Sequence, residues 1–373
     1  MAIAILGADT LGRVQTLPPD WPGGFWWHWL VFTIVMIVFV LCMIIGVIYI
    51  ERRGLARLQA RVGPNRTGPF GLLQAIADAI KVLTKEGIMP TNADKIVYWL
   101  APVIVFAPVI MIFAVVPLQD GAVLADLNIG ILFVLAISSL STVGVFMAGW
   151  GSSNKYSLIS VMRLVAAVIS YEIPVVLAIV GVVLIAGSLS LNQIILAQNI
   201  PFILLQPLGF LILFIGGSAE INRSPFDLME ADSEIVAGFH IEYSGMKFAM
   251  FYLGEYGEAV VMSTIITVLF LGGWRGPFLP PWLWFVLKLL AVFFLMVWTR
   301  TTLPRARIDQ LMSLAWKFLF PLALINLLIT AVQVLAWPEA LPWLMIPVNF
   351  AIAAVLILLW SKFFKLGGGR VEV

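Results

Sequence analysis

The chain has 373 residues, of which 62% are hydrophobic and 11% are charged, and its mean hydropathy is +1.05. This composition excludes a soluble globular protein and predicts a protein that crosses a membrane several times. The net charge of +2 gives no basis for nucleic-acid binding. The single cysteine, Cys42, excludes an internal disulfide and a cysteine-ligated iron–sulfur cluster within this chain.

Apolar stretches of the length that crosses a bilayer recur along the chain. They predict an all-α membrane protein with one polytopic domain over residues 1–373 and about nine transmembrane helices. The expected spans are residues 30–50, 97–117, 130–150, 160–187, 201–219, 247–271, 282–299, 313–336 and 342–361. Pro207 is expected to kink the fifth span.

Positive charge is concentrated in alternate connections between the spans. Nearly all Lys and Arg residues lie in residues 51–96, 151–159, 220–246, 300–312 and the C-terminal tail. The positive-inside rule places these segments in the cytoplasm. The N-terminal segment, residues 1–29, is therefore expected outside, and the C-terminus inside.

The loop over residues 51–96 contains a predicted amphipathic surface helix. From Leu72 onward, Ile76 and Ile80 share one helical face, whereas Asp78 and Lys81 lie on the opposite face. A helix that only rests on the lipid headgroups is an equally good interpretation of this pattern.

Residues 220–242 are unusually acidic for a membrane protein, with six carboxylates and one guanidinium, that of Arg223. Ser224 and Pro225 predict an N-cap and the first helical position. Such a helix would place Asp227, Glu230 and Glu234 on one face as an acidic stripe. An ordinary solvated acidic loop is the alternative, but membrane-spanning sequence flanks this loop on both sides.

Carboxylates are also expected inside the membrane. Glu172 lies in the fourth span, and intramembrane glutamate is rare and usually functional. A Glu172 that only fixes helix packing through a cation is the alternative. Glu255 and Glu258 lie one turn apart in the sixth span, where they could hold or relay protons. Lys288 in the seventh span is either their partner or extends toward the outer surface.

The connection over residues 300–312 is basic, with Arg300, Arg305 and Arg307 beside Asp309. These arginines fit the positive-inside rule without a special role. They could also be counter-ions to the acidic loop or a docking patch for another subunit.

Five motifs between residues 51 and 312 stand out: ERRGLARLQARVGPNRTGPFGLLQAIADAIKVLTKE, WGSSNKYSLIS, ISYEIP, AEINRSPFDLMEADSEIVAGFHIEYSGMKFA and RTTLPRARIDQLM. Together, and in this order, they resemble the H subunit family of bacterial NADH:quinone oxidoreductase, respiratory complex I, equivalent to mitochondrial subunit 1. The resemblance implies a multi-pass subunit of the bacterial plasma (inner) membrane. That subunit forms the quinone-access tunnel and the first part of the proton path that couples quinone reduction to proton translocation.

The resemblance also implies roles for individual residues, with no catalytic residue and no metal ligand among them. The implied quinone-binding residues are Glu51, Arg52, Gln59, Arg61, Asp78, Glu220, Arg223, Phe226, Asp227, Arg300, Arg305 and Arg307. The implied proton-path residues are Glu172, Glu230, Glu234, Glu242, Glu255 and Asp309. The sequence departs from the family pattern at Met229, Asp232 and Glu258, where proline, glutamate and a neutral residue are usual.

Quinone is the implied substrate of a proton-translocating enzyme whose NADH, FMN and iron–sulfur clusters are bound by partner subunits. The H subunit of that family carries no redox centre of its own, and the same is implied for this chain. The implied partners are hydrophilic subunits on the cytoplasmic side, small membrane-arm subunits at its flanks, and the lipid bilayer. Two rivals are the quinone-independent membrane anchor of an energy-converting hydrogenase and a secondary ion transporter. The latter should show inverted repeats, and we find none in the sequence.

Overall fold

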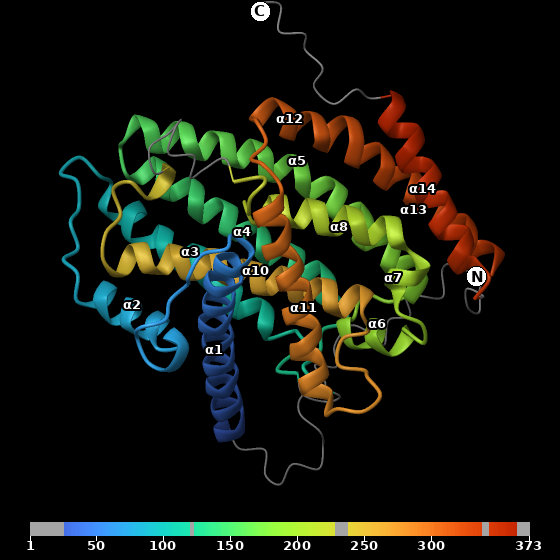
Figure 1. Ribbon diagram of the computed structural model, residues 1–373, viewed down its shortest axis with the longest axis horizontal. Coiled ribbons are helices and arrows are strands. Elements are labelled where there is room, and N and C mark those ends of the chain that lie inside the picture. The colour runs from blue at the N-terminus through green and yellow to red at the C-terminus, as the bar shows by residue number, and fades with distance from the viewer. Residues whose placement is uncertain (1–25, 120–122, 228–237, 338–342, 364–373) are drawn as a thin grey trace, which may run out of the picture.

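The computed structural model describes residues 26–119, 123–227, 238–337 and 343–363, and these form a bundle of helices (Figure 1). The helices are α1 (Trp26–Leu58), α2 (Gln74–Leu83), α3 (Lys95–Phe113), α4 (Gly130–Gly151), α5 (Lys155–Ala186), α6 (Leu191–Ala197), α7 (Phe202–Leu205), α8 (Pro207–Glu220), α10 (Met246–Phe270), α11 (Pro281–Thr302), α12 (Ile308–Ser313), α13 (Phe320–Ala336) and α14 (Met345–Phe363). Single turns form at Pro69–Gly71 and Gly238–His240, and a π-helix at Leu314–Leu319 joins α12 to α13. The predicted all-α membrane class is confirmed.

Eight of the described helices are long and apolar enough to cross a membrane. The fifth predicted span differs, because it is broken at Gln206 into α7 and the 14-residue α8. Pro207 opens α8 as its first residue; its missing N–H cannot continue a helix from the preceding turn. The expected kink is therefore a full break.

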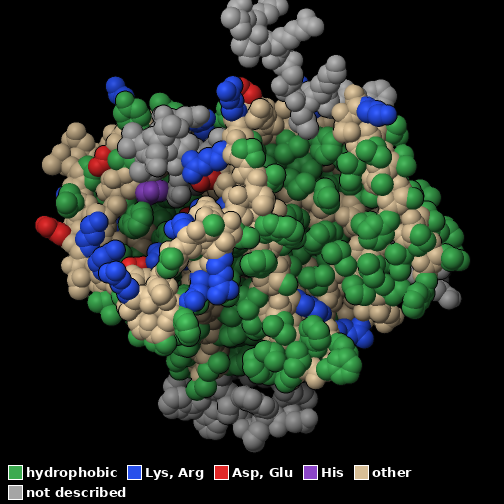
Figure 2. Space-filling view, viewed as in Figure 1, with side chains coloured by type: hydrophobic (Ala, Val, Ile, Leu, Met, Phe, Trp, Pro, Cys, Tyr) green, Lys and Arg blue, Asp and Glu red, His purple; other side chains and the backbone are tan. Residues whose placement is uncertain are grey.

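The connections sort into two ends of the bundle. We call the end with residues 59–94, 152–154, 221–227, 238–245 and 303–307 the charged end, and the end with residues 114–119, 123–129, 187–201 and 271–280 the opposite end. At the charged end, Ala306 N donates to Pro225 O over 3.0 Å. Figure 2 shows Lys and Arg side chains gathered over one half of the visible face, whereas hydrophobic side chains cover the half occupied by α13 and α14.

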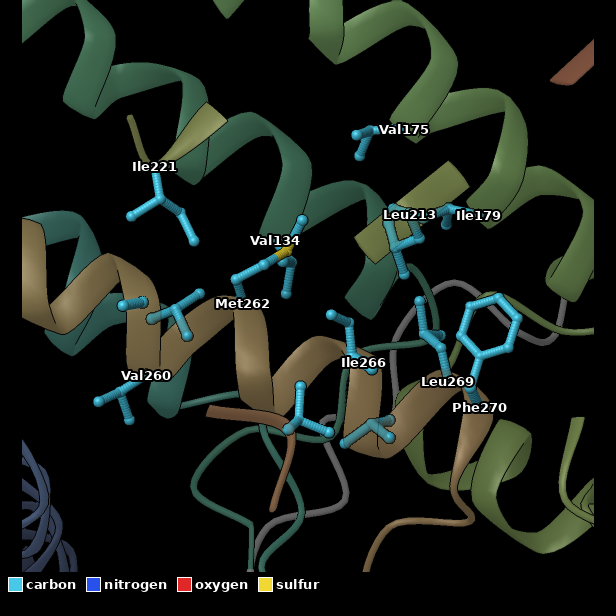
Figure 3. Close-up of a cluster of buried hydrophobic side chains, with 14 of the residues drawn as sticks. Val134, Val175, Ile179, Leu213, Ile221, Val260, Met262, Ile266, Leu269 and Phe270 are labelled. Carbon is cyan, nitrogen blue, oxygen red and sulfur yellow. The ribbon is translucent and has the colours of Figure 1, made fainter. Parts of the chain in front are cut away.

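Helix α10 lies at the centre of the hydrophobic core. Figure 3 shows Val260, Ile266 and Phe270 of α10 beside side chains of α4, α5 and α8. Close approach of α3 depends on glycine: a Cβ added at Gly257 would lie 2.6 Å from Val109 Cγ1. Small residues at such contacts bring helix backbones together in membranes. This packing sets the position of the carboxylates that α10 carries.

Two cations at the opposite end bind backbone carbonyls. Lys288 Nζ donates to the carbonyls of Leu271, Gly273 and Arg275 over 2.7, 3.0 and 2.6 Å. Arg275 Nη1 donates to carbonyls of residues 195, 196 and 198. Lys288 therefore extends toward the opposite end. It does not pair with the carboxylates of α10, which was the other possibility.

Candidate functional site

The site centres on a buried ion cluster at the charged end. Glu51 lies near the end of α1, and its side chain is only 2% exposed. Arg223 Nη1 donates to both Glu51 carboxylate oxygens, over 2.9 and 3.1 Å, and Arg300 from the end of α11 contacts the same carboxylate. A buried carboxylate needs such partners, because an isolated buried charge is strongly unfavourable.

A turn after α8 places Arg223 in this cluster. Asn222 adopts a left-handed conformation, with φ of 57°, which asparagine tolerates better than most residues. The chain thereby leaves the axis of α8, and Arg223 reaches α1 and α10 together. Its Nε lies 3.4 Å from Glu255 Oε1, and its guanidinium lies 4.2 Å from the centre of the Tyr256 ring.

The electrostatics of Arg223 are set by its acidic neighbours. Burial alone would lower the pKa of the guanidinium, but the charges of Glu255 and Glu51 outweigh burial and raise it. Arg223 therefore keeps its positive charge, and this charge joins the carboxylate on α1 to the carboxylate on α10.

A line of carboxylates continues from Arg223 into the bundle. Glu255 and Glu258 lie on α10, and Glu258 interacts electrostatically with Glu255 and with Glu220 at the end of α8. Glu220 in turn interacts with Glu172 of α5. Three helices, α5, α8 and α10, thus supply one series of ionisable groups.

Two neighbouring cavities accompany this line, with volumes of about 50 and 40 Å³. Both are lined by Glu220, Glu258, Ser141 and Thr142, and Glu255 lines the smaller one. Each has room for about three water molecules. Carboxyl and hydroxyl groups around such volumes can hold and pass protons through water.

The basic connection pairs with the acidic loop. Arg305 Nη2 donates to Asp227 Oδ2 over 3.1 Å, and the Asp227 side chain is 6% exposed. Arg305 is therefore a counter-ion to the acidic loop, the second of the three roles that the sequence left open, whereas Arg300 pairs with Glu51 of α1. Phe226, next to Asp227, packs against the Tyr171 ring of α5 at 5.8 Å between centres.

The predicted helix starting at Pro225 is wrong for the residues that the structure describes. Ser224 to Asp227 form a turn and a bend, closed by Phe226 N donating to Arg223 O over 2.9 Å. The Asp227 carboxylate pairs with Arg305 instead of completing a capping box, so a tertiary ion pair overrides the local helix signal. Glu230 and Glu234 lie outside the described residues.

Helix α2 is attached to α1 by a second ion pair. Arg52 Nη1 donates to Asp78 Oδ2 over 2.5 Å, and Gln74 Nε2 donates to Asp78 Oδ1 over 3.1 Å. Burial opposes ionisation of Asp78, but these hydrogen bonds outweigh burial and lower the pKa of its carboxyl. The apolar face predicted for α2 is exposed at Ile76, Ile80 and Leu83.

Other predicted site residues lie at the surface of the charged end. Arg61 Nε donates to Gln59 Oε1 over 2.7 Å, and both side chains are exposed. Glu242 accepts from Asn154 Nδ2 over 2.8 Å, away from the carboxylates of α10. Arg307 and Asp309 are exposed at the start of α12.

Two tyrosines of the site have no clear sequence signal. Tyr252 donates to the hydroxyl of Tyr256 over 3.2 Å, and its own hydroxyl lies within hydrogen-bonding reach of Arg52. Tyr256 in turn faces Arg223. The tyrosines therefore connect the ion pair of α1 and α2 to the buried cluster. In the sequence, only their spacing of one helical turn beside Glu255 indicates that the two tyrosines share a helix face.

Comparison with known proteins decides the family. The family model described as NADH dehydrogenase matches residues 31–331. The NADH-quinone oxidoreductase H subunit of Dehalococcoides mccartyi is 57% identical over 349 residues, which cover 94% of this chain and 99% of that relative. The chain belongs to the H subunit family of NADH-quinone oxidoreductase.

More distant relatives in the H subunit family agree with this assignment. The H subunit of Carboxydothermus hydrogenoformans is 50% identical over 76% of this chain and 82% of its own length. The H subunit of Brevibacillus brevis is 47% identical over 85% of this chain and 95% of its own length. The buried ion cluster at Glu51 and the carboxylates of α5, α8 and α10 all lie within the region that the family model matches.

Proposed function

We propose that this membrane subunit of complex I forms the quinone-access path and the first part of the proton path that couples quinone reduction to proton translocation. The observation that carries the proposal is the series of ionisable groups from Asp78 to Glu172, which are joined by ion pairs, hydrogen bonds and electrostatic interactions, with two hydratable cavities beside its inner part. A helix bundle that only anchored other subunits would not need carboxylates at this depth.

The charged end supplies the quinone part of the proposal. Quinone enters between α1, α2 and the acidic loop, where Arg52 and Asp78 are half-buried and the apolar face of α2 is open. An isoprenoid tail fits such an apolar face, and the polar headgroup meets Arg300, Arg305 and Phe226 further in. The exposed Gln59, Arg61 and Arg307 would line the outer part of the path.

The buried carboxylates supply the proton part. Reduction of quinone to quinol takes up two protons, so the field at Glu51 and Arg223 changes with each turnover. Arg223 passes this change to Glu255, because it is the cation that both carboxylates share. Glu220 and Glu172 then gain or release protons through the hydrated cavities. Glu230, Glu234, Glu242 and Asp309 are proposed to exchange protons with the cytoplasmic side.

The electron carriers of the reaction are proposed to lie on partner subunits. NADH, FMN and iron–sulfur clusters would be bound by hydrophilic subunits docked at the charged end, and small membrane-arm subunits would continue the proton path at the flank of the bundle. In this proposal the charged end lies in the cytoplasm and the N-terminus lies outside the bacterial plasma membrane, as the positive-inside rule predicts.

The test is Glu172→Gln in the assembled complex, because this change removes the proton site and keeps the shape of the side chain. We expect NADH-driven quinone reduction coupled to proton uptake in proteoliposomes to fall about tenfold or more. The matched control is Glu86→Gln, which changes an exposed acid of the charged end. Normal turnover and normal pumping in Glu172→Gln would contradict the proposed proton path.

A purified complex that carried a hydrogenase in place of a quinone-reducing activity would favour the hydrogenase-anchor alternative. Such a complex would keep the buried cluster but reduce no quinone, so the quinone assay with the unmodified chain separates the two functions.

A further inference from the structure

A second polar cluster lies where α7 breaks from α8, at the end of α8 opposite to Glu220. Its side chains are Gln206 at the break, Asn326, Thr330 and Gln333 of α13, and Asn349 of α14. All are at most 8% exposed, although α13 and α14 present apolar side chains elsewhere on their surfaces. Polar groups buried among membrane helices need hydrogen-bond partners, because the bilayer interior supplies none.

Most of this cluster is paired within the protein. Gln206 Nε2 donates to Thr330 Oγ1 over 3.0 Å, and Thr330 Oγ1 donates to the Asn326 carbonyl over 2.8 Å. Gln333 Nε2 donates to Asn349 Oδ1 over 2.6 Å, and Asn349 Nδ2 donates to the Leu205 carbonyl at the end of α7 over 2.6 Å. The amides thus tie both C-terminal helices to the break.

One acceptor of the cluster is left over. Gln206 Oε1 is buried with no hydrogen-bond partner, and Gln206 is 3% exposed. A cavity of about 10 Å³ adjoins the Gln206 residue and is lined by Gln206, Asn326, Thr330, Gln333 and Asn349 among others. This volume is close to that of a single water, and polar cavities of this size are usually hydrated.

We propose that this cavity binds one ordered water molecule, which donates a hydrogen bond to Gln206 Oε1. The other amide and hydroxyl side chains lining the cavity provide its further partners. A metal cation is the competing ligand for such oxygens, but none of the described residues lining the cavity is ionisable. A charge there would be uncompensated in a low-dielectric environment, so a neutral molecule fits the site.

The water completes the hydrogen bonding of the helix break. When the water is bound, Gln206 Oε1 at the break between α7 and α8 has a hydrogen-bond donor inside the bilayer. Helix α8 carries Glu220 at its other end, so the hydrated cluster holds the far end of an element that contributes to the ion site. The assignment itself does not depend on quinone or proton chemistry.

The decisive measurement is a cryo-EM map of the assembled complex at a resolution that shows ordered waters. We expect one density within hydrogen-bonding distance of Gln206 Oε1 and of a second polar side chain of the cluster. An empty cavity, an Oε1 bonded to a protein donor, or ligand distances too short for water would each overturn the proposal.

A variant map tests the role of Gln206. Gln206→Met keeps the length of the side chain but removes the amide, so the density should disappear while Asn349 still binds the Leu205 carbonyl. A density that persisted in Gln206→Met would show that other side chains hold the molecule and would overturn the assigned contact. If this variant does not assemble, the map of the unmodified complex decides alone.

Discussion

Arg223 joins the turn after α8 to both α1 and α10. Its planar guanidinium reaches Glu51 of α1, Glu255 and the Tyr256 ring of α10 from a single position after α8. Lysine has a single ammonium on a flexible stem and could not hold these three directions at once. Because Glu51 is also held by Arg300, the cluster has two cations for its two carboxylates.

Arg223→Met is therefore expected to destabilise the folded subunit by about 3–5 kcal/mol, the cost of breaking a buried ion pair. Thermal denaturation of the purified complex measures this as a lower transition temperature for the subunit. The double variant Arg223→Met with Glu51→Gln should recover part of the loss, because it removes the carboxylate left without its main partner. Additive losses in the double variant would contradict direct coupling.

Asp78 gives the site a pH dependence of known sign. The pKa of its carboxyl is lowered from the ordinary value of 3.8, so its contribution to stability is complete above pH 3.8 and is lost as pH falls through the lower folded value. Amide hydrogen exchange of α2 should be slower in the unmodified chain than in Asp78→Asn at pH 7, and the two should converge at strongly acidic pH. Equal exchange at pH 7 would mean that Arg52 does not hold α2.

Among the elements, helices with long apolar runs were predicted well, because hydropathy and length decide them. The exceptions depend on side chains from distant parts of the sequence. The break at Gln206 depends on Asn349 and Thr330, which lie far away in the sequence and supply hydrogen bonds to the interrupted segment. The turn at Ser224 forms where a helix was expected, because the Asp227 side chain is hydrogen-bonded to Arg305.

The contact of α3 with α10 depends on small residues at the crossing. Gly257→Leu should cost about 1–3 kcal/mol or more, because the new side chain overlaps Val109. The yield of assembled complex and its thermal stability measure this cost. Val109→Ala in the same chain should restore part of both; no restoration would place the clash elsewhere.

For the whole molecule, sequence could single out candidate acids but not how they lie relative to one another. Glu172 and Glu255 were singled out by their depth in apolar sequence and Glu220 as part of the acidic loop, but their proximity depends on the packing of α5, α8 and α10. Glu258 had no assigned role from its motif, and the structure places it between Glu220 and Glu255. Glu242 belongs to the same acidic stretch of sequence as Glu220, but in the structure it accepts a hydrogen bond from Asn154.

The orientation of the molecule can be tested with single cysteines in a Cys42→Ser background. Leu279→Cys lies at the opposite end and should react with a membrane-impermeant maleimide in intact spheroplasts. Lys362→Cys, near the end of α14, should react only after the membrane is opened. The reverse pattern would invert the proposed topology.

The carbonyl-bound cations of the opposite end change how charge should be counted in this chain. Arg275 donates to the last carbonyls of α6, where positive charge offsets the negative end of the helix dipole, and Lys288 donates to carbonyls of the connection that follows α10. Neither cation is then fully available to phosphate headgroups or to the membrane potential. In the proposed orientation, the effective excess of positive charge on the inner side is thus larger than a count of Lys and Arg residues suggests. Neutralising Lys288 should therefore disturb the fold of the outer loop more than the direction in which the chain inserts.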